Sequence, residues 1–304
     1  MRFSRTLALG ATMLVLLVGA CSSGGGSSKP TVKVGSVGFD EARIMAEAYA
    51  QVLENAGFTV NRDGIGLGDR KVLLPALESG QIDLQPEYIG SGLGAGYGGT
   101  PTGDAAANEA ALQAILSGKG GGITVLDYTP AQDQNAFVVR KDTADQYSLT
   151  KMSDVAAVQD KLKLGLAKDC PTNPLCAGAL KDAYGIDTTN ATLLSACDTP
   201  MAQALVAKTI DLGELCSTQP DIIVNNFVLL EDDKKTQPAD NISPLVRNDL
   251  LAKTDKAAFS KLLNDLSAKV DTATLADLYK QVSIDKKDIK DVVSTWLKAQ
   301  GLVK

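Results

Sequence analysis

The sequence predicts an α/β protein of two lobes, each built on a mainly parallel β-sheet flanked by helices. Strand-like and helix-like segments alternate along most of the chain, which is typical of parallel sheets covered by helices. The alternation runs in two blocks, one before and one after Ser153, so we expect two such units. The 304 residues are enough for one large domain or two of ordinary size.

The first block contains three expected helices and five expected strands. A helix is predicted over 40–55, because Ile44, Ala48 and Val52 recur at helical spacing and Gly57 follows as a stop. Further helices are expected over 69–79, where Pro75 favours a kink or a shorter helix, and over 104–117. The expected strands span 31–37, 58–60, 82–84, 123–126 and 136–139. The glycine-rich stretch 89–102 is expected to be either a mobile loop at a cleft mouth or a plain solvent loop.

The second block repeats the alternation and ends in a long helical tail. Strands are expected at 164–167, 192–194, 210–212 and 222–230, and helices at 154–161, 175–184 and 201–208. The tail from 249 to 302 reads as almost wholly helical, with stops near Asp271 and Ile284. These elements complete the second lobe and add helices to the first.

The N-terminus has the pattern of an export signal. Arg2 and Arg5 precede an apolar run over 7–20, which has the length of a signal-peptide core and is shorter than a membrane span. The run ends in Leu-Val-Gly-Ala-Cys, which resembles the lipobox of bacterial lipoproteins. We therefore expect a signal peptide over 1–20, a lipid on Cys21, and a flexible Ser/Gly tether over 21–30. The alternative is a plain signal peptide with an incidental cysteine. The lipid would hold the mature protein outside the cytoplasm at the cell membrane.

Charge and composition exclude several classes of function. The formal net charge is −6, and removal of Arg2 and Arg5 with the leader makes it −8. An acidic protein of this kind is not expected to bind nucleic acid. The sequence contains no histidine, which excludes histidine-based triads and histidine-ligated zinc. We expect no catalytic residues, no metal and no cofactor.

Four cysteines remain after the lipid anchor, and export favours disulfides between them. Three pairings are possible. We favour Cys170 with Cys176, because the proline- and asparagine-rich segment between them suggests a tight loop, and this leaves Cys197 with Cys216. A thiolate metal site is disfavoured because no Cys-x-x-Cys spacing occurs.

Few other residues suggest chemistry. The glycines of 64–68 lack the spacing of a nucleotide-binding loop and are expected to bring backbone close to a helix that begins near Asp69. Asp83, Glu87 and Asp133 lie near predicted strand ends, where they are either acid/base groups or charged loop residues. Ser217-Thr218 follows a strand, where its hydroxyls either bind a ligand or cap a turn.

Several segments together resemble a known family. They are Val32-Lys33-Val34-Gly35-Ser36, Phe39-Asp40-Glu41, the stretch from Ala76 to Gly90 with its Pro86-Glu87-Tyr88, the stretch from Pro130 to Val139, and Val228-Leu229-Leu230-Glu231-Asp232-Asp233-Lys234. This order resembles the substrate-binding lipoproteins of osmoprotectant ABC importers, which bind glycine betaine, choline or proline betaine. The resemblance covers residues 31–304.

The resemblance implies a type II periplasmic-binding-protein clamshell with a small solute bound between the lobes. Residues 31–134 and 240–304 would form the first lobe, and 135–239 the second. Such a protein is not an enzyme: the solute favours the closed state, which docks on a membrane permease. We expect a monomer. The alternatives are a sensing lipoprotein with the same fold and, less favoured, an extracytoplasmic hydrolase.

The resemblance also indicates where the solute binds. Tyr88 and Ser91 occupy the positions of the family's first-lobe tyrosine and hydroxyl, whereas the other cage positions fall on Asn135, Cys216 and Asp240, none of them aromatic. A four-ring cage for a trimethylammonium group is therefore largely missing, and Tyr97 or Tyr128 would have to substitute. We expect weak or altered betaine recognition, or another small polar or aromatic solute. The candidate ligand-binding residues are Tyr88, Ser91, Asp133, Asn135, Cys216, Ser217, Thr218 and Asp240.

Overall fold

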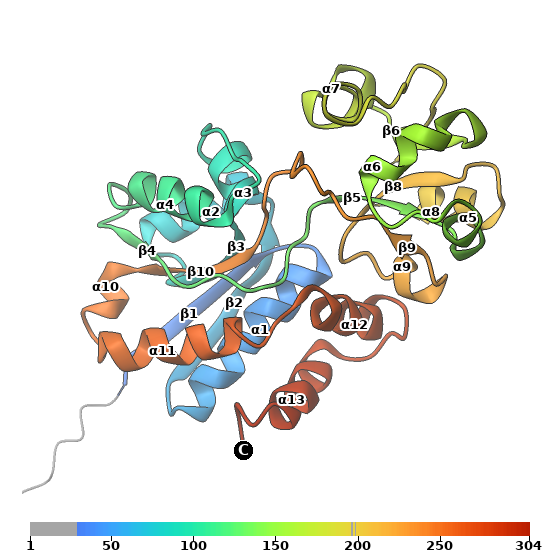
Figure 1. Cartoon of the computed structure of the whole chain (residues 1–304). Helices are drawn as coiled ribbons and strands as arrows, with labels where there is room; N and C mark the ends of the chain where they lie inside the picture. Colours follow the sequence, from blue (N-terminus) through green and yellow to red (C-terminus); the bar gives the residue numbers. More distant parts are fainter. Residues whose placement is uncertain (1–28, 196, 198) are drawn as a thin grey trace, which may run out of the picture.

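A computed structural model describes residues 29–195, 197 and 199–304 of the chain, and it contains two five-stranded sheets (Figure 1). The predicted signal peptide, Cys21 and all of the tether before residue 29 lie outside the described residues. We call the part built on the first sheet the first lobe and the part built on the second sheet the second lobe. The two sheets occupy separate halves of the molecule.

The first-lobe sheet has the strand order β2-β1-β3-β10-β4. Strands β1, β2 and β3 are parallel, whereas β10 runs antiparallel to both of its neighbours. The strands span Thr31–Val37 (β1), Thr59–Gly68 (β2), Leu84–Tyr88 (β3), Ile123–Val125 (β4) and Ile242–Arg247 (β10).

Helices cover this sheet on both faces, as Figure 1 shows. The central one is α1 (Asp40–Asn55), which packs on β1 and β2 and on the C-terminal helices, and its large residues Ile44, Met45 and Tyr49 are fully buried. The others are α2 (Arg70–Ser79), α3 (Ile89–Ser91), a π-helical turn (Gly92–Gly96), α4 (Ala105–Leu116), α10 (Asn248–Leu251), α11 (Lys256–Ser267), α12 (Thr272–Ser283) and α13 (Ile289–Ala299).

The second-lobe sheet repeats the pattern, with the strand order β7-β6-β8-β5-β9. Here β5 is the strand that runs antiparallel to both neighbours, and its register places Asn135 opposite Cys216. The strands span Asn135–Val139 (β5), Leu164–Ala167 (β6), Thr192–Leu194 (β7), Leu212–Cys216 (β8) and Val228–Leu229 (β9). The helices are α5 (Lys141–Tyr147), α6 (Met152–Val155), α7 (Ala179–Tyr184), α8 (Thr199–Val206) and α9 (Asp221–Val224), with 3-10 turns at Ala156–Lys161 and Cys170–Thr172 and a π-helical turn at Pro174–Gly178.

Two extended segments join the sheets, one from β4 to β5 and one from β9 to β10 (Figure 1). They run side by side: Gln132 forms an isolated antiparallel bridge with Asn241, and the Asp133 amide donates to the Asp240 carbonyl at 3.2 Å. Each segment leads into the antiparallel strand of the next sheet. The mainly parallel, two-lobed α/β fold is therefore confirmed, with one antiparallel strand in each sheet.

Most predicted elements lie near where the sequence placed them, and β1, α1, β6 and β7 match to the residue. The expected strands over 82–84 and 210–212 are misplaced, because β3 begins only at Leu84 and β8 only at Leu212. The expected strand over 222–230 is wrong, because its first part forms α9 and only Val228–Leu229 is extended. The loop expected over 89–102, whether mobile or plainly solvent-exposed, is wrong for its first half. That half is helical through Gly96, and its residues Ile89 and Leu93 are buried. Strand β10 and helix α5 were not predicted.

The structure contains disulfides Cys170–Cys176 and Cys197–Cys216, with Cα–Cα distances of 5.0 and 4.8 Å. They join the same cysteines that the sequence analysis favoured, and both lie in the second lobe. Within the described residues, every helix is too short or too polar to cross a bilayer.

Candidate functional site

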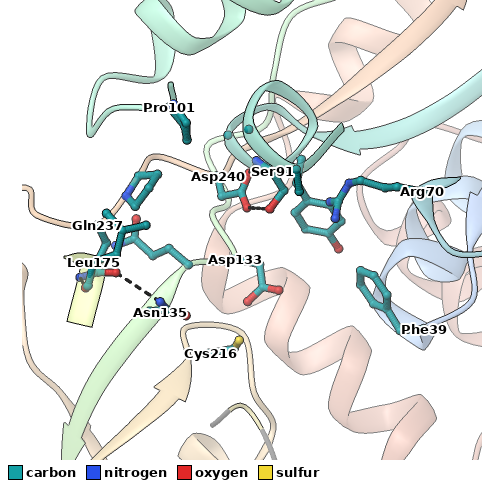
Figure 2. Close-up of a pocket in the computed structure, with 16 residues that line it drawn as sticks. Phe39, Arg70, Ser91, Pro101, Asp133, Asn135, Leu175, Cys216, Gln237 and Asp240 are labelled. Atoms are coloured by element: carbon teal, nitrogen blue, oxygen red, sulfur yellow. Dashed lines mark hydrogen bonds between the residues drawn. The ribbon is translucent and has the colours of Figure 1, made fainter. Parts of the chain in front are cut away.

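A cavity of about 510 Å³ lies between the two lobes (Figure 2). Strands β1 and β3 of the first lobe and β8 of the second point their carboxyl ends at it, which is where ligands bind in open α/β sheets. The cavity is lined by residues of both lobes and of the segments that join them. They are Phe39, Arg70, Tyr88, Gly90, Ser91, Gly94, Ala95 and Pro101 of the first lobe, Asn135, Leu175 and Cys216 of the second lobe, and Asp133, Gln134, Gln237, Pro238 and Asp240 of the connecting segments.

Two aromatic rings of the first lobe meet at one side of the cavity. Tyr88 ends the fully buried strand β3, and Phe39 follows β1 immediately before α1. Their ring centroids are 5.7 Å apart at an interplanar angle of 37°, and Phe39 is 41% exposed. The guanidinium carbon of Arg70 lies 5.9 Å from the Tyr88 ring centre. The pair forms an aromatic corner in which Phe39 is the exposed ring, whereas Tyr88 is 3% exposed and has Arg70 beside it. The face of an exposed ring attracts a cation.

The Tyr88 hydroxyl is held by a buried carboxyl group. It donates to Glu41 Oε1 at 2.5 Å, and Glu41 is only 1% exposed. The second oxygen, Oε2, is buried without a hydrogen-bond partner. Burial, together with the nearby Asp133 carboxyl, raises the pKa of Glu41 to about 8. A pKa raised in this way favours the protonated form of the Glu41 carboxyl group at neutral pH.

Asp240 and Ser91 form a second polar pair across the top of the cavity in Figure 2. The Ser91 amide donates to Asp240 Oδ1 at 2.8 Å and its hydroxyl to Oδ2 at 2.6 Å. Gly90 permits this approach, because a Cβ there would lie 2.7 Å from the Ala239 carbonyl oxygen. Burial raises the pKa of Asp240 to about 7, although the Ser91 hydrogen bonds lower it in part.

Asp133 is held from the second lobe. The Thr218 hydroxyl donates to Asp133 Oδ1 at 2.8 Å, and burial raises the pKa of Asp133. The neighbouring Ser217 hydroxyl donates to the Gln132 carbonyl at 2.7 Å and accepts the Gln134 amide at 3.1 Å. Both hydroxyls thus fasten the end of β8 to the connecting segment.

Arg70 is the cation of the cavity lining. Its Nε donates to Glu87 Oε1 at 2.9 Å, and Glu87 is 2% exposed in β3, so Glu87 is a buried strand residue and the charged-loop alternative is wrong for it. Burial raises the pKa of Glu87, and Arg70 opposes that rise. Besides Glu87, which is paired with Arg70, three carboxyl groups of the described residues lie at or beside the cavity: those of Glu41, Asp133 and Asp240.

Among the described residues of the second lobe, none contributes an aromatic ring to the lining. Its wall consists of Asn135, whose amide donates to Gln237 Oε1 at 3.3 Å, the Cys216 disulfide and Leu175. Gln237 is 2% exposed and also donates to the Leu175 carbonyl at 2.7 Å.

The structure brings six of the eight candidate residues to the cavity: Tyr88, Ser91, Asp133, Asn135, Cys216 and Asp240. Ser217 and Thr218 lie behind the lining and support it. Tyr97 and Tyr128 do not substitute for missing rings, because Tyr97 donates to Glu78 and Tyr128 packs on the first-lobe core. Phe39, Arg70, Leu175 and Gln237 also line the cavity and are not among the candidate residues predicted from the sequence. Phe39 had a signal, since it follows the first strand of an α/β lobe.

Comparison with known proteins agrees with this geometry. Residues 30–299 match the family described as the substrate binding domain of the ABC-type glycine betaine transport system. The chain belongs to this family. It is 28% identical over 286 residues to the glycine betaine-binding protein YehZ of Escherichia coli, covering 90% of this chain and 92% of that one. It is also 28% identical over 245 residues to the carnitine transport binding protein OpuCC of Listeria monocytogenes, covering 78% of each chain.

The solved structure of apo YehZ from Escherichia coli matches this chain with a TM-score of 0.79 and 24% identity, covering 90% of this chain and 99% of that one, so the likeness is one of fold. The protein is thus a solute-binding subunit of an ABC importer with a type II periplasmic-binding-protein fold. Its family context implies a small-molecule ligand, a membrane permease as partner and a place outside the cytoplasm. Its relatives are named for binding a solute and not for catalysis.

Proposed function

We propose that the cavity binds a small quaternary ammonium solute and prefers a net cation such as choline to a zwitterion such as glycine betaine. The observation that carries this proposal is the presence of the Phe39–Tyr88 corner and the Asp133 and Asp240 carboxyl groups in one cavity. Ring faces attract a cation that has no hydrogen-bond donors, and carboxylates add a Coulombic attraction. The names of relatives, which mention glycine betaine and carnitine, support the quaternary ammonium class.

The preference for a net cation follows from the balance of charges. A zwitterion brings a carboxylate, which the acidic groups repel and only Arg70 attracts, and the Nε of Arg70 is already bound to Glu87. The altered betaine recognition expected from the missing four-ring cage stays a prediction. Its physical basis is that the cavity contains a corner of two rings, Phe39 and Tyr88, where the cage would have four.

Isothermal titration of the purified protein with choline, glycine betaine and carnitine tests the proposal. We expect saturable binding of choline that is tighter than that of glycine betaine, and substitution Phe39→Leu should weaken choline binding by roughly three- to tenfold. The matched control is Phe58→Leu, because Phe58 packs edge-on against Phe259 away from the cavity. Tighter binding of glycine betaine than of choline would refute the charge preference, and the absence of binding by any of the three would refute the solute class.

We also propose that the protein is a monomeric lipoprotein that performs no chemistry on its solute. Cleavage before Cys21, a lipid on that cysteine and the Ser/Gly tether would keep the clamshell beside its permease. The division into 31–134 with 240–304 and 135–239 is part of the same proposal. Labelling cells with a fatty-acid probe tests the anchor: the label should appear on the wild-type protein and disappear in Cys21→Ser.

A further inference from the structure

We propose that Leu175 is the apolar wall through which the second lobe contacts the bound solute, and that the Cys170–Cys176 loop holds it in place. This inference rests on the proposed function, because it assigns a specificity-determining residue within the same cavity. It concerns the side of the cavity that has no aromatic ring.

The first support is the exposure of Leu175. The side chain lines the cavity, and the residue is 38% exposed. Burial of a large apolar side chain is favourable, so contact with a solute would stabilise the complex. The other lining residues on this side are Asn135, Cys216, Gln237 and Pro238, so Leu175 is the largest apolar side chain that the second lobe offers to a solute. A solute with methyl groups would cover it.

The second support is the set of contacts that fix the Leu175 backbone. It lies beside Cys176 in the loop closed by the Cys170–Cys176 disulfide, and both half-cystines of that loop are fully buried. Its amide donates to Asn173 Oδ1 at 2.9 Å, and its carbonyl accepts the Gln237 amide group at 2.7 Å. A residue restrained in this way loses little conformational freedom when it binds, which favours affinity.

The third support is the placement of Leu175 relative to the rings. In Figure 2 Leu175 and Gln237 lie on one side of the cavity, and Phe39 and Arg70 lie on the other. A trimethylammonium group between them would face the aromatic corner with the methyl groups on one side and Leu175 with those on the other. An aliphatic side chain offers dispersion contacts but no ring face. It therefore discriminates between solutes by their shape and not by their charge.

The experiment is titration of the purified protein and its variants with choline. Leu175→Ala should weaken choline binding roughly tenfold, whereas Leu175→Tyr should bind at least as tightly as the wild type, because a ring replaces the aliphatic wall. The control is Leu193→Ala, since Leu193 is 43% exposed in β7 and does not line the cavity. Binding by Leu175→Ala within twofold of wild type would overturn the inference.

A second arm tests the support of Leu175. Gln237→Met removes the hydrogen bond to the Leu175 carbonyl, together with the one from the Asn135 amide group, and keeps a side chain of similar length. We expect it to weaken choline binding several-fold in the wild type and to have a smaller effect in the Leu175→Ala background, as coupled residues do. Equal effects in both backgrounds would refute a role through Leu175. If the wild-type protein binds no quaternary ammonium solute, both the proposed function and this inference are wrong. If the wild type binds choline and Leu175→Ala binds it equally well, only the inference is wrong.

Discussion

Each of the three carboxyl groups around the cavity accepts a hydrogen bond from a hydroxyl group: Glu41 from Tyr88, Asp240 from Ser91 and Asp133 from Thr218. The hydroxyls orient the carboxyl groups without neutralising them. Burial disfavours the charged form of each carboxyl group and raises its pKa, and a bound cation would favour release of the proton. Proton uptake and cation binding therefore compete at these residues.

We predict that choline affinity rises with pH between 6 and 8. The pKa of Asp240 is about 7 in the folded protein, against 3.8 for a free carboxyl, so at pH 6 most molecules carry the proton that a cation must displace. The raised pKa also affects the stability of the protein without solute. The free energy of unfolding falls as the pH rises from about 4 to 8, because in this range the unfolded chain binds fewer protons than the folded protein. Arg70 favours ionisation of Asp240 and Glu87 opposes it.

Titration calorimetry should give an affinity about tenfold higher at pH 8 than at pH 6 if Asp240 alone dominates. In Asp240→Asn the dependence should be smaller, with the remainder due to Glu41 and Asp133. An affinity independent of pH would contradict the assignment.

The strand β2 shows how neighbouring elements determine the role of a glycine. The glycine pattern over 64–68 predicts a close approach of backbone to a helix start, and Gly68 does precede Asp69, the N-cap of α2. Gly64, however, lies within β2 opposite Gly35 of β1. A Cβ on Gly64 would lie 2.6 Å from Ile82 Cγ2 and 2.9 Å from the Val34 carbonyl oxygen. The two strands can pack beneath Ile82 only without that atom.

Gly64→Ala should therefore destabilise the protein by about 1–3 kcal/mol, the usual cost of overpacking a close contact. Urea unfolding followed by circular dichroism measures the free energy of unfolding. Gly118→Ala is the matched control, because the nearest atom to its added Cβ is the Ile115 carbonyl oxygen at 3.8 Å. Equal stability of the two variants would show that Ile82 moves aside without cost.

The whole molecule is organised around the two connecting segments. The segments lie side by side, because the Asp133 amide donates a hydrogen bond to the Asp240 carbonyl. Both residues also line the cavity, so each segment that joins the lobes contributes to the binding site. A solute that contacts these residues and both walls would favour a closed arrangement of the lobes, because only that arrangement makes all contacts at once.

We predict that saturating choline makes the molecule more compact and more stable. Small-angle scattering should show a smaller radius of gyration, and choline at about 100 times its dissociation constant should add about 2.7 kcal/mol to the free energy of unfolding. Sodium chloride at the same ionic strength is the control for a salt effect. Binding without compaction would show that the cavity takes its solute without closure of the lobes.

The sequence by itself determined the α/β class, the two-lobed organisation and most strand and helix positions, because hydrophobic periodicity and glycine stops are local properties. It also placed Tyr88, Asp133 and Asp240 among the candidate residues. The tertiary structure alone decided the rest. Strand β10 was missed because its burial depends on β3 and β4, and Leu175 and Phe39 became neighbours of one cavity only when two sheets faced each other. The pKa values of Glu41 and Asp240 likewise arise from burial and from charges distant in the sequence, which no local pattern contains.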